Sequence, residues 1–317
     1  MKASIYTIIA LIAFAANSLL CRMALSENYI DPWNFTIIRL LGGAICLVII
    51  MFLHEQRIKN QNKDDENNNN ADVPVVLSKR ISNEQILSDK GSWLSSFSLV
   101  AYALCFSLAY VELDTGTGAL ILFAAVQFTM IGWGIYQKEQ LSLIQWAALV
   151  VAFAGFIYLM LPSATVPSLF GAIIMMTSGI AWGIYSVRGK ACVSPLRATG
   201  FNFIRSLVAL PLLLLAGITY LADINIQGIL LAGVSGAITS GIGYSIWYIA
   251  MPLLKSTQAA VVQFCVPILA AIAGVLFLSE ALTLRFIIAS TVILGAVLVF
   301  VLNKHILKSP TRVKIVN

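Results

Sequence analysis

Ten long apolar segments, separated by short polar connections, dominate the hydrophobic pattern of this chain. A hydrocarbon core of about 30 Å requires about 20 apolar residues in a membrane-spanning helix. The segments are continuously apolar rather than alternating, which favours helices over the strands of a membrane barrel. The pattern therefore predicts an all-α integral membrane protein with ten transmembrane helices, at approximately 4–25, 34–53, 93–112, 115–136, 142–161, 168–188, 197–217, 228–248, 257–278 and 283–303.

The ten segments form two sets of five with related sequences. Arg22 and Arg39 are 17 positions apart, and so are Arg188 and Arg205. A Glu-x-Leu-Ser/Thr sequence between the fourth and fifth segments recurs between the ninth and tenth. Because five is odd, the second copy must enter the membrane from the opposite side, which turns the copies into inverted repeats. We predict two inverted five-helix repeats and a tail, at 1–161 (with a loop insertion at 54–92), 166–304 and 305–317.

The composition supports a membrane protein and excludes several other classes. Hydrophobic residues make up 59% of the 317 positions and charged residues only 11%, whereas a soluble protein carries roughly 25% charged residues. The net charge of +6 does not indicate nucleic-acid binding, because the charges lie between apolar segments and not on one basic face. The five cysteines are dispersed and both histidines lie at segment ends, so we expect no metal site, disulfide framework or cofactor.

The distribution of Lys and Arg predicts the orientation in the membrane. With the N-terminus taken as cytoplasmic, 16 of the 20 basic residues lie on the cytoplasmic side. Only Arg22 and Arg285 lie on the other side, and Arg39 and Arg205 lie within spans. Because positively charged connections stay in the cytoplasm, we expect both termini there. We also expect the protein to lie in the inner membrane of a bacterium.

The connection at 54–92 is the one long polar stretch between the predicted spans. Its low hydrophobicity and its run of asparagines predict a flexible loop. A short helix is expected to start near Ser82 and to end near Asp89. This composition favours an insertion without function over a regulatory or partner-binding segment.

Polar side chains inside the predicted spans are candidates for function, because polar groups are costly in a bilayer. Arg39 and Arg205 either bind an anionic group of a solute or serve a structural role, and their repeat symmetry favours the structural role. The amides of Asn17, Gln127 and Gln263 either contact a polar solute or form hydrogen bonds between helices. Asn202 and Gln258 belong to the same class of residue.

Aromatic residues form a second set of candidates. Tyr102, Phe106 and Tyr110 recur every four residues and therefore share a helix face. Tyr102, Phe106 and Trp182 lie deeper in their spans than interfacial aromatic residues do, and we interpret them as walls of a pocket. Tyr110, Trp247 and Tyr248 lie nearer to span ends, where an aromatic belt at the membrane interface is expected.

Two features that the sequence lacks limit the energy sources that a transporter of this kind could use. No Asp or Glu lies in the middle of a predicted span, although proton-driven transporters usually carry a titratable group at this depth. The chain also lacks the Gly-x4-Gly-Lys-Ser/Thr loop that binds nucleotide phosphates. These features disfavour proton/drug exchange and ATP-driven pumping, and they are compatible with facilitated diffusion or exchange.

These motifs resemble the drug/metabolite transporter superfamily, in its ten-helix EamA branch. The resemblance is carried by the five-plus-five repeat, the sequence Ala181-Trp182-Gly183-Ile-Tyr185 before Arg188, and the Glu-x-Leu-Ser/Thr sequences at Glu139 and Glu280. It covers nearly the whole chain except the loop at 54–92. It implies that a solute faces the residues Asn17, Tyr102, Phe106, Gln127, Trp182, Tyr185, Tyr244 and Gln263. The small four-helix multidrug relatives carry a glutamate in the first span, where this chain has Asn17.

The sequence thus predicts a secondary transporter of a small polar or zwitterionic metabolite, such as an amino acid, that acts by alternating access as an exporter or facilitator. The alternative within the same class is efflux of drugs or cationic amines. A membrane enzyme would need a catalytic cluster, and Glu112 and Asp114 have no histidine near them, so no enzyme is expected. A scaffold would act through the loop at 54–92. No sequence feature defines an oligomeric state, and a monomer is compatible with the sequence.

We predict that the connection after the sixth span and the C-terminal tail both face the cytoplasm. In a variant without the native cysteines, Ala191→Cys and Ser309→Cys should react with a membrane-impermeant maleimide only from the cytoplasmic side of vesicles. Asn28→Cys should react only from the other side. Labelling of positions 191 and 309 from opposite sides would contradict the inverted repeats.

Overall fold

The computed structural model describes residues 2–67, 83–160, 168–279 and 284–303, and these residues form helices and short connections without strands. Seven helical segments are long and apolar enough to cross a membrane, and three shorter apolar helices lie at 93–109, 143–155 and 287–300. Together they fall at the ten predicted spans, whereas ten complete membrane crossings stay a prediction. The helix at 83–88 falls within the predicted segment from Ser82 to Asp89.

The helices of the first half are α1 (Lys2–Ser26), α2 (Pro32–Asn67), α4 (Trp93–Ala109), α5 (Thr115–Tyr136) and α6 (Leu143–Met160). The second half begins with α7 (Leu169–Gly189) and a segmented span of α8 (Pro195–Ser206), η1 (Leu207–Ala209), α9 (Leu210–Gly217) and η2 (Ile218–Asp223). It continues with α10 (Ile226–Val234), η3 (Ser235–Ile242), α11 (Gly243–Ala250), η4 (Met251–Leu253), α12 (Ser256–Val262), α13 (Cys265–Leu278) and α14 (Leu284–Leu302).

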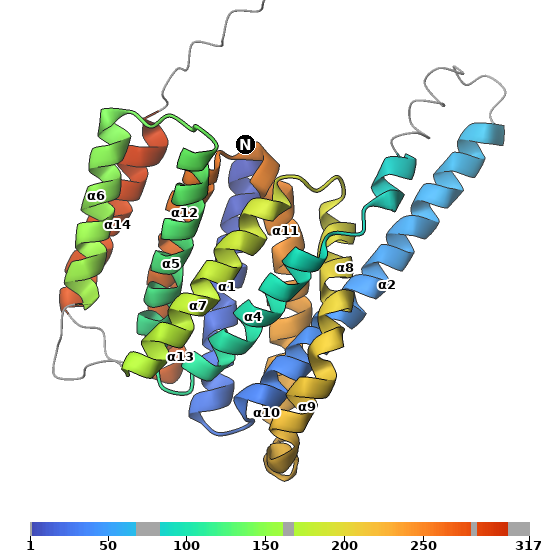
Figure 1. The fold of residues 1–317 in the computed structure, drawn as a ribbon, viewed down its shortest axis with the longest axis horizontal. Coiled ribbons are helices and arrows are strands. Elements are labelled where there is room, and N and C mark those ends of the chain that lie inside the picture. Colours follow the sequence, from blue (N-terminus) through green and yellow to red (C-terminus); the bar gives the residue numbers. More distant parts are fainter. Residues whose placement is uncertain (1, 68–82, 161–167, 280–283, 304–317) are drawn as a thin grey trace, which may run out of the picture.

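The helices lie side by side, with α6 and α14 at one edge of the bundle and α2, α8 and α9 toward the other (Figure 1). α14 ends at the same end of the bundle as the N-terminus (Figure 1). Side-chain contacts join the connections at this end, since Gln145 donates to the backbone oxygen of Asn303 at 3.2 Å. Lys190, which follows α7, forms an ion pair with Glu139 at 3.6 Å.

The two halves of the chain interleave rather than form separate domains. α4 packs on α7 in the same way that α1 packs on η3 and α11, and α5 packs on α7 as α1 packs on α13. α2 packs on α10 and η3 as α4 packs on α8, and the remaining large contacts join α2 to α8 and α9, α5 to α12 and α13, and α6 to α14. Each pairing therefore has a counterpart when the halves are exchanged. This reciprocity supports the predicted repeat, while its inverted orientation in a membrane stays a prediction.

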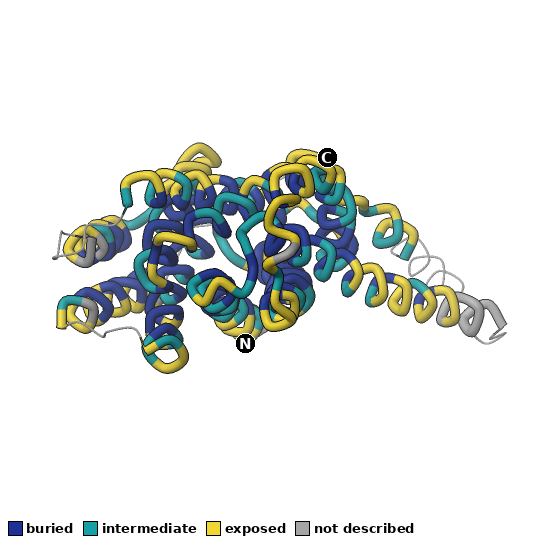
Figure 2. Tube along the Cα trace, turned by 90° about the horizontal axis from the view of Figure 1, so that it is seen from below, coloured by how far each residue is buried: buried dark blue, intermediate teal, exposed yellow. Residues whose placement is uncertain are grey.

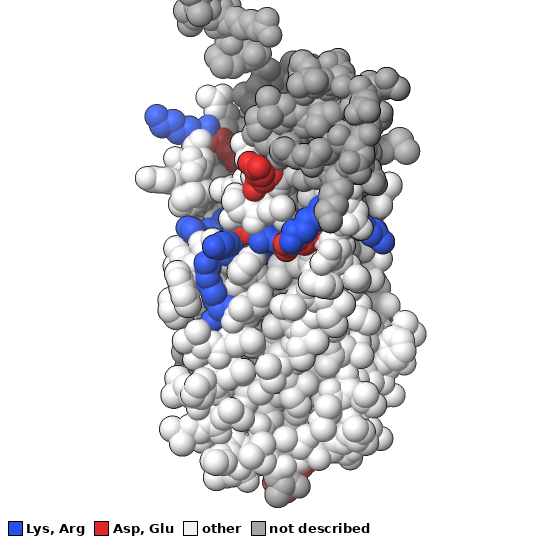
Figure 3. Space-filling view, turned by 90° about the vertical axis from the view of Figure 1, so that its right-hand side faces the viewer, with Lys and Arg blue, Asp and Glu red and all other residues white. Residues whose placement is uncertain are grey.

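The outer surface is apolar, as lipid contact requires. Buried residues lie on the faces that the helices turn toward one another, and exposed residues lie on the outer faces (Figure 2). Many of the exposed side chains are large and hydrophobic, such as Ile45, Leu215 and Phe277. Such a surface far exceeds the apolar patches of a soluble monomer. On the face formed by α2 and α8, the Lys and Arg side chains gather near one end, above a broad uncharged surface (Figure 3).

Two spans of the second half depart from regular α-helix near the centre of the bundle. Residues 235–242 form the π-helix η3, a rare element that often marks functional positions. A Cβ atom at Gly236 would overlap the backbone oxygen of Arg39, so glycine permits the close approach of η3 to α2. The ninth span is interrupted between Val262, where α12 ends, and Cys265, where α13 begins. Pro267 lies in the first turn of α13, where its missing N–H leaves no helical hydrogen bond unmade.

Glu139 holds the start of α12, as expected for a residue at a helix end. Its carboxylate accepts the backbone N–H groups of Ser256 at 2.8 Å and Thr257 at 3.0 Å, and also the Thr257 hydroxyl at 3.0 Å. Burial alone would raise the pKa of the Glu139 carboxyl, but these donors and the Lys190 ammonium together lower it below its usual value. Glu139 thus joins the fourth, sixth and ninth spans at one end of the bundle. The repeat partner Glu280 lies outside the described residues.

We predict that Glu139→Gln destabilises the folded protein by about 1–2 kcal/mol at pH 7, because it removes the charge that caps α12. The folded pKa of Glu139 is lowered, so its contribution is complete above the unfolded value of about 4.3 and is lost as the pH falls through the folded value. The difference in apparent unfolding temperature between wild type and Glu139→Gln should therefore shrink at acidic pH. Glu27→Gln, at an exposed position, is the control. Equal effects of both variants at pH 7 would contradict this role.

Candidate functional site

Arg39 of α2 lies at the centre of the bundle and is 1% exposed. Its Nε donates to the Ser240 hydroxyl of η3 at 3.1 Å. Its Nη2 donates to the hydroxyls of Tyr102 at 3.0 Å and Tyr244 at 2.7 Å, which come from α4 and α11. The guanidinium carbon also lies 5.0 Å from the ring centroid of Tyr102 and 4.9 Å from that of Phe106, within the range of cation–π attraction. One side chain thus connects three other helical elements.

Asn17 of α1 forms a second polar centre beside Arg39. Its amide nitrogen donates to the Tyr102 hydroxyl at 3.1 Å. Its amide oxygen accepts the hydroxyls of Ser235 at 2.7 Å and Thr239 at 3.1 Å from η3. Because Tyr102 also accepts from Arg39, the two centres form one hydrogen-bonded network that spans both halves of the chain.

Aromatic rings surround this network. The ring of Trp182, from α7, lies 4.6 Å from that of Tyr244, 4.9 Å from that of Tyr102 and 5.1 Å from that of Phe14. Its indole N–H donates to the Gln263 side-chain oxygen at 3.0 Å, at the interruption between α12 and α13. Trp182 therefore links the aromatic cluster to the irregular part of the ninth span.

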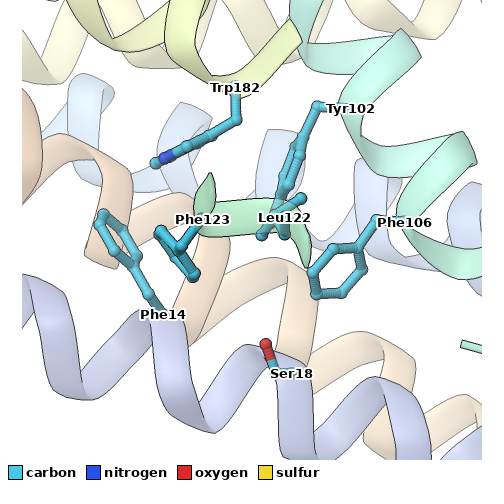
Figure 4. A pocket seen from close by; sticks show the side chains of 7 residues that line it. All are labelled: Phe14, Ser18, Tyr102, Phe106, Leu122, Phe123 and Trp182. Carbon is cyan, nitrogen blue, oxygen red and sulfur yellow. The ribbon is translucent and has the colours of Figure 1, made fainter. Parts of the chain in front are cut away.

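The cluster encloses a very small cavity. Its volume is about 10 Å³, and its lining consists of Phe14, Ser18, Tyr102, Phe106, Leu122, Phe123 and Trp182 (Figure 4). This is about the space of one water molecule. A metabolite does not fit there unless the surrounding helices move apart, so the structure is closed around its centre.

The electrostatic character of the centre is positive. Among the buried polar side chains of the described residues, the charged ones are Arg39 and Arg197, and none is Asp or Glu. Arg197 has a carboxylate partner, because its guanidinium lies 3.5 Å from Glu55. Arg39 is surrounded by hydroxyls and aromatic rings instead, and within the described chain its Nη1 has no hydrogen-bond partner. The centre therefore suits a group with negative charge.

Most of the predicted substrate-binding residues come together here. Asn17, Tyr102, Phe106, Trp182 and Tyr244 form the network and its aromatic wall. Tyr185 stacks on Trp182 with ring centroids 5.4 Å apart, and Gln263 accepts the indole hydrogen bond. Whether these residues bind a solute stays a prediction.

Gln127 and Arg205 lie outside the network. Gln127 is buried on α5 and donates to the backbone oxygen of Ala260. Arg205 donates to the backbone oxygen of Lys90 at 2.7 Å and lies 5.2 Å from the ring centroid of Trp93, at the end of the bundle. Arg39 and Arg205 share a place in the repeat, but their surroundings differ, so a common structural role has no support in their contacts.

The interface-belt interpretation of Tyr110, Trp247 and Tyr248 is wrong. All three are at most 1% exposed. Trp247 donates to the Ser186 hydroxyl at 3.1 Å, and Tyr248 donates to the backbone oxygen of Tyr185 at 2.9 Å. Their positions near span ends led to the belt assignment, but position along a span does not define which face of the helix meets lipid.

Several residues of the site were missed by the sequence analysis. Phe14 and Ser18 line the cavity. They are four residues apart on α1 and therefore share a helix face, close to Asn17. On the eighth span, Ser240 lies one turn before Tyr244, and both reach Arg39. Tyr244 was predicted and Ser240 was missed, and a search for small hydroxyl residues at helical spacing from the candidate tyrosines would have found Ser240.

The fold and the site define a multi-pass helical membrane protein with a closed polar centre between its two halves. The model of the EamA-like transporter family matches residues 1–161 and 169–302. The chain therefore belongs to the EamA-like transporter family, in the drug/metabolite transporter superfamily, and is a membrane transporter.

Relatives cover most of the chain. An uncharacterized protein of Pseudomonas aeruginosa is 38% identical over 92% of this chain and 91% of its own length. An uncharacterized transporter of Archaeoglobus fulgidus is 25% identical over 72% of this chain and 82% of its own. The uncharacterized transporter YoaV of Bacillus subtilis is 20% identical over 87% of each. A solved crystal structure with 18% identity has a TM-score of 0.61 and covers 93% of this chain and 97% of its own, which supports the fold alone.

We predict that Asn17→Ala destabilises the folded protein by about 1–2 kcal/mol, because it removes the bonds that join α1 to α4 and η3. The control is Ser18→Ala, which removes a buried hydroxyl that has no hydrogen-bond partner in the described structure and should cost less than about 0.5 kcal/mol. The apparent unfolding temperatures of the purified proteins provide the measurement. Similar losses for both variants would argue against the Asn17 network.

Proposed function

We propose that this protein is a secondary transporter of a small polar or zwitterionic metabolite, such as an amino acid, and that it works by alternating access as an exporter or facilitator. The observation that carries the proposal is the hydrogen-bonded and aromatic cluster around Arg39, Asn17 and Trp182, which both halves of the chain build. The proposal places the protein in a bacterial inner membrane with both termini in the cytoplasm. Its partners are then the solute and the lipid bilayer, without nucleic acid.

Contacts between the halves at both ends of the bundle support alternating access. At the end of the bundle where the N-terminus lies, Glu139 binds the start of α12 and Lys190. At the other end, the backbone N–H of Asn225 donates to the oxygen of Tyr29 at 2.8 Å, and Asn34 donates to the backbone oxygen of Gly217 at 3.0 Å. If the contacts at one end break while those at the other end stay intact, the centre becomes exposed to one side of the membrane at a time.

The charge of the centre favours a zwitterion or an anion over a cationic amine. A second positive charge next to Arg39 would be repelled in a medium of low dielectric constant. Carriers of cations usually place a carboxylate at this depth, and the buried residues that the structure describes include no Asp or Glu. Efflux of cationic amines is therefore the weaker alternative.

The proposal predicts that Trp182→Ala lowers transport of radiolabelled amino acids into proteoliposomes at least tenfold, because the variant opens the aromatic wall of the site. Trp133→Ala is the control, since Trp133 is 41% exposed on the outside of the bundle and should keep the wild-type rate. Size-exclusion profiles verify that both variants are folded. Full transport by Trp182→Ala would show that this cluster does not contribute to the transport path.

A further inference from the structure

Arg39 carries a full charge that no carboxylate within the described chain balances. Its partners are three hydroxyls and two aromatic faces. Transfer of an ion from water to a protein interior costs several kcal/mol, and hydroxyl groups and π faces offset only part of this cost. A neutral amide such as Asn17 already joins helices here without a charge. A hydrogen-bonded link between the helices therefore does not require the positive charge of the guanidinium.

One particular nitrogen of the Arg39 guanidinium forms no hydrogen bond in the described residues. Nε and Nη2 donate to Ser240, Tyr102 and Tyr244, whereas Nη1 has no hydrogen-bond partner in the described residues. A buried donor without an acceptor costs about 1–3 kcal/mol, and more when it is charged. Arginine is well suited to carboxylates because its planar fork matches their geometry.

Arg39 is not itself a lining residue of the small cavity, but two of the aromatic residues that it contacts are. The ring centroids of Tyr102 and Phe106 lie 5.0 Å and 4.9 Å from the guanidinium carbon, and both residues line the cavity. The cavity wall formed by α1 includes the hydroxyl of Ser18, which is also buried without a hydrogen-bond partner in the part of the chain that the structure describes. Two unused donors thus neighbour the same pair of aromatic residues, and Figure 4 shows Ser18 across the cavity from Tyr102.

We propose that Arg39 is the binding site for the carboxylate of the transported solute, with Ser18 as a second donor and Tyr102 and Tyr244 as the groups that position the guanidinium. The remaining cavity walls are apolar: Phe14, Phe106, Leu122, Phe123 and Trp182. The solute class is therefore a carboxylate attached to an apolar or aromatic body, which includes the aliphatic and aromatic amino acids. This inference rests on the proposed transport function and specifies its substrate.

The experiment compares ligands that differ only in the carboxylate. Binding of L-phenylalanine and L-leucine to purified wild-type protein is measured by thermal shift, alongside phenylalaninamide and leucinamide, and the same four compounds are tested in proteoliposomes. Ligand binding to the folded state raises its apparent stability. We expect the acids to bind at least tenfold more tightly than the amides. In Arg39→Gln this ratio should fall to about one, because the positive charge that attracts the carboxylate is removed. In Arg39→Lys it should fall only in part, because the ammonium keeps the charge but not the planar geometry of the guanidinium. Arg205→Gln, which changes the repeat-related arginine outside the network, should keep the wild-type ratio.

Each outcome has a defined meaning. An unchanged ratio of acid to amide binding in folded Arg39→Gln or Arg39→Lys would overturn the assignment of Arg39, even if the variant is less stable, because lost stability alone indicates a cross-link. A wild-type protein that prefers the amides in binding and transport would overturn the carboxylate assignment and leave the transport function intact. A wild-type protein that neither binds nor transports any of the four compounds would refute the proposed amino-acid substrates themselves. Arg39→Lys retains the positive charge and provides the test if Arg39→Gln does not fold.

Discussion

The rest of the structure depends on one buried charge, the guanidinium of Arg39. A full charge in the middle of an apolar bundle is costly unless most of its donors are matched. Here the acceptors come from α4, η3 and α11, and the rings of Tyr102 and Phe106 cover its faces. These elements belong to both halves of the chain. The matching of one charge therefore fixes how the halves meet and leaves one donor available at their junction.

Irregular backbone makes this arrangement possible. The π-helix η3 presents Ser235, Thr239 and Ser240 toward Asn17 and Arg39, and Gly236 lets it approach α2 closely. The interruption after α12 places Gln263 at the indole N–H of Trp182. Regular helices would satisfy their own backbone but would not direct so many side-chain hydroxyls and amides to one point. In the proposed alternating access, the same irregular segments are suited to act as hinges.

Much of the fold could be predicted from the sequence, because continuous apolar runs of this length are typical of membrane-spanning helices and rare elsewhere. Asn17, Tyr102, Trp182 and Tyr244 could be identified as candidates because polar and aromatic groups at depth are unusual. The rotation of each helix about its own axis could not be predicted. For that reason the sequence placed Tyr110, Trp247 and Tyr248 at the interface although they are buried. The repeat symmetry likewise suggested one role for Arg39 and Arg205, whereas tertiary contacts gave them different surroundings.

The central claim is that the closed cavity beside Arg39 opens alternately to the two sides of the membrane. Leu122→Cys, in a variant without the native cysteines, places one thiol in the cavity wall. Its reaction with a membrane-impermeant thiol reagent, added separately to each side of vesicles that carry the protein in a known orientation, tests the claim directly. The account predicts slow labelling from both sides and protection by a bound solute. A thiol that reacts from one side only, or from neither side while transport proceeds, would contradict it.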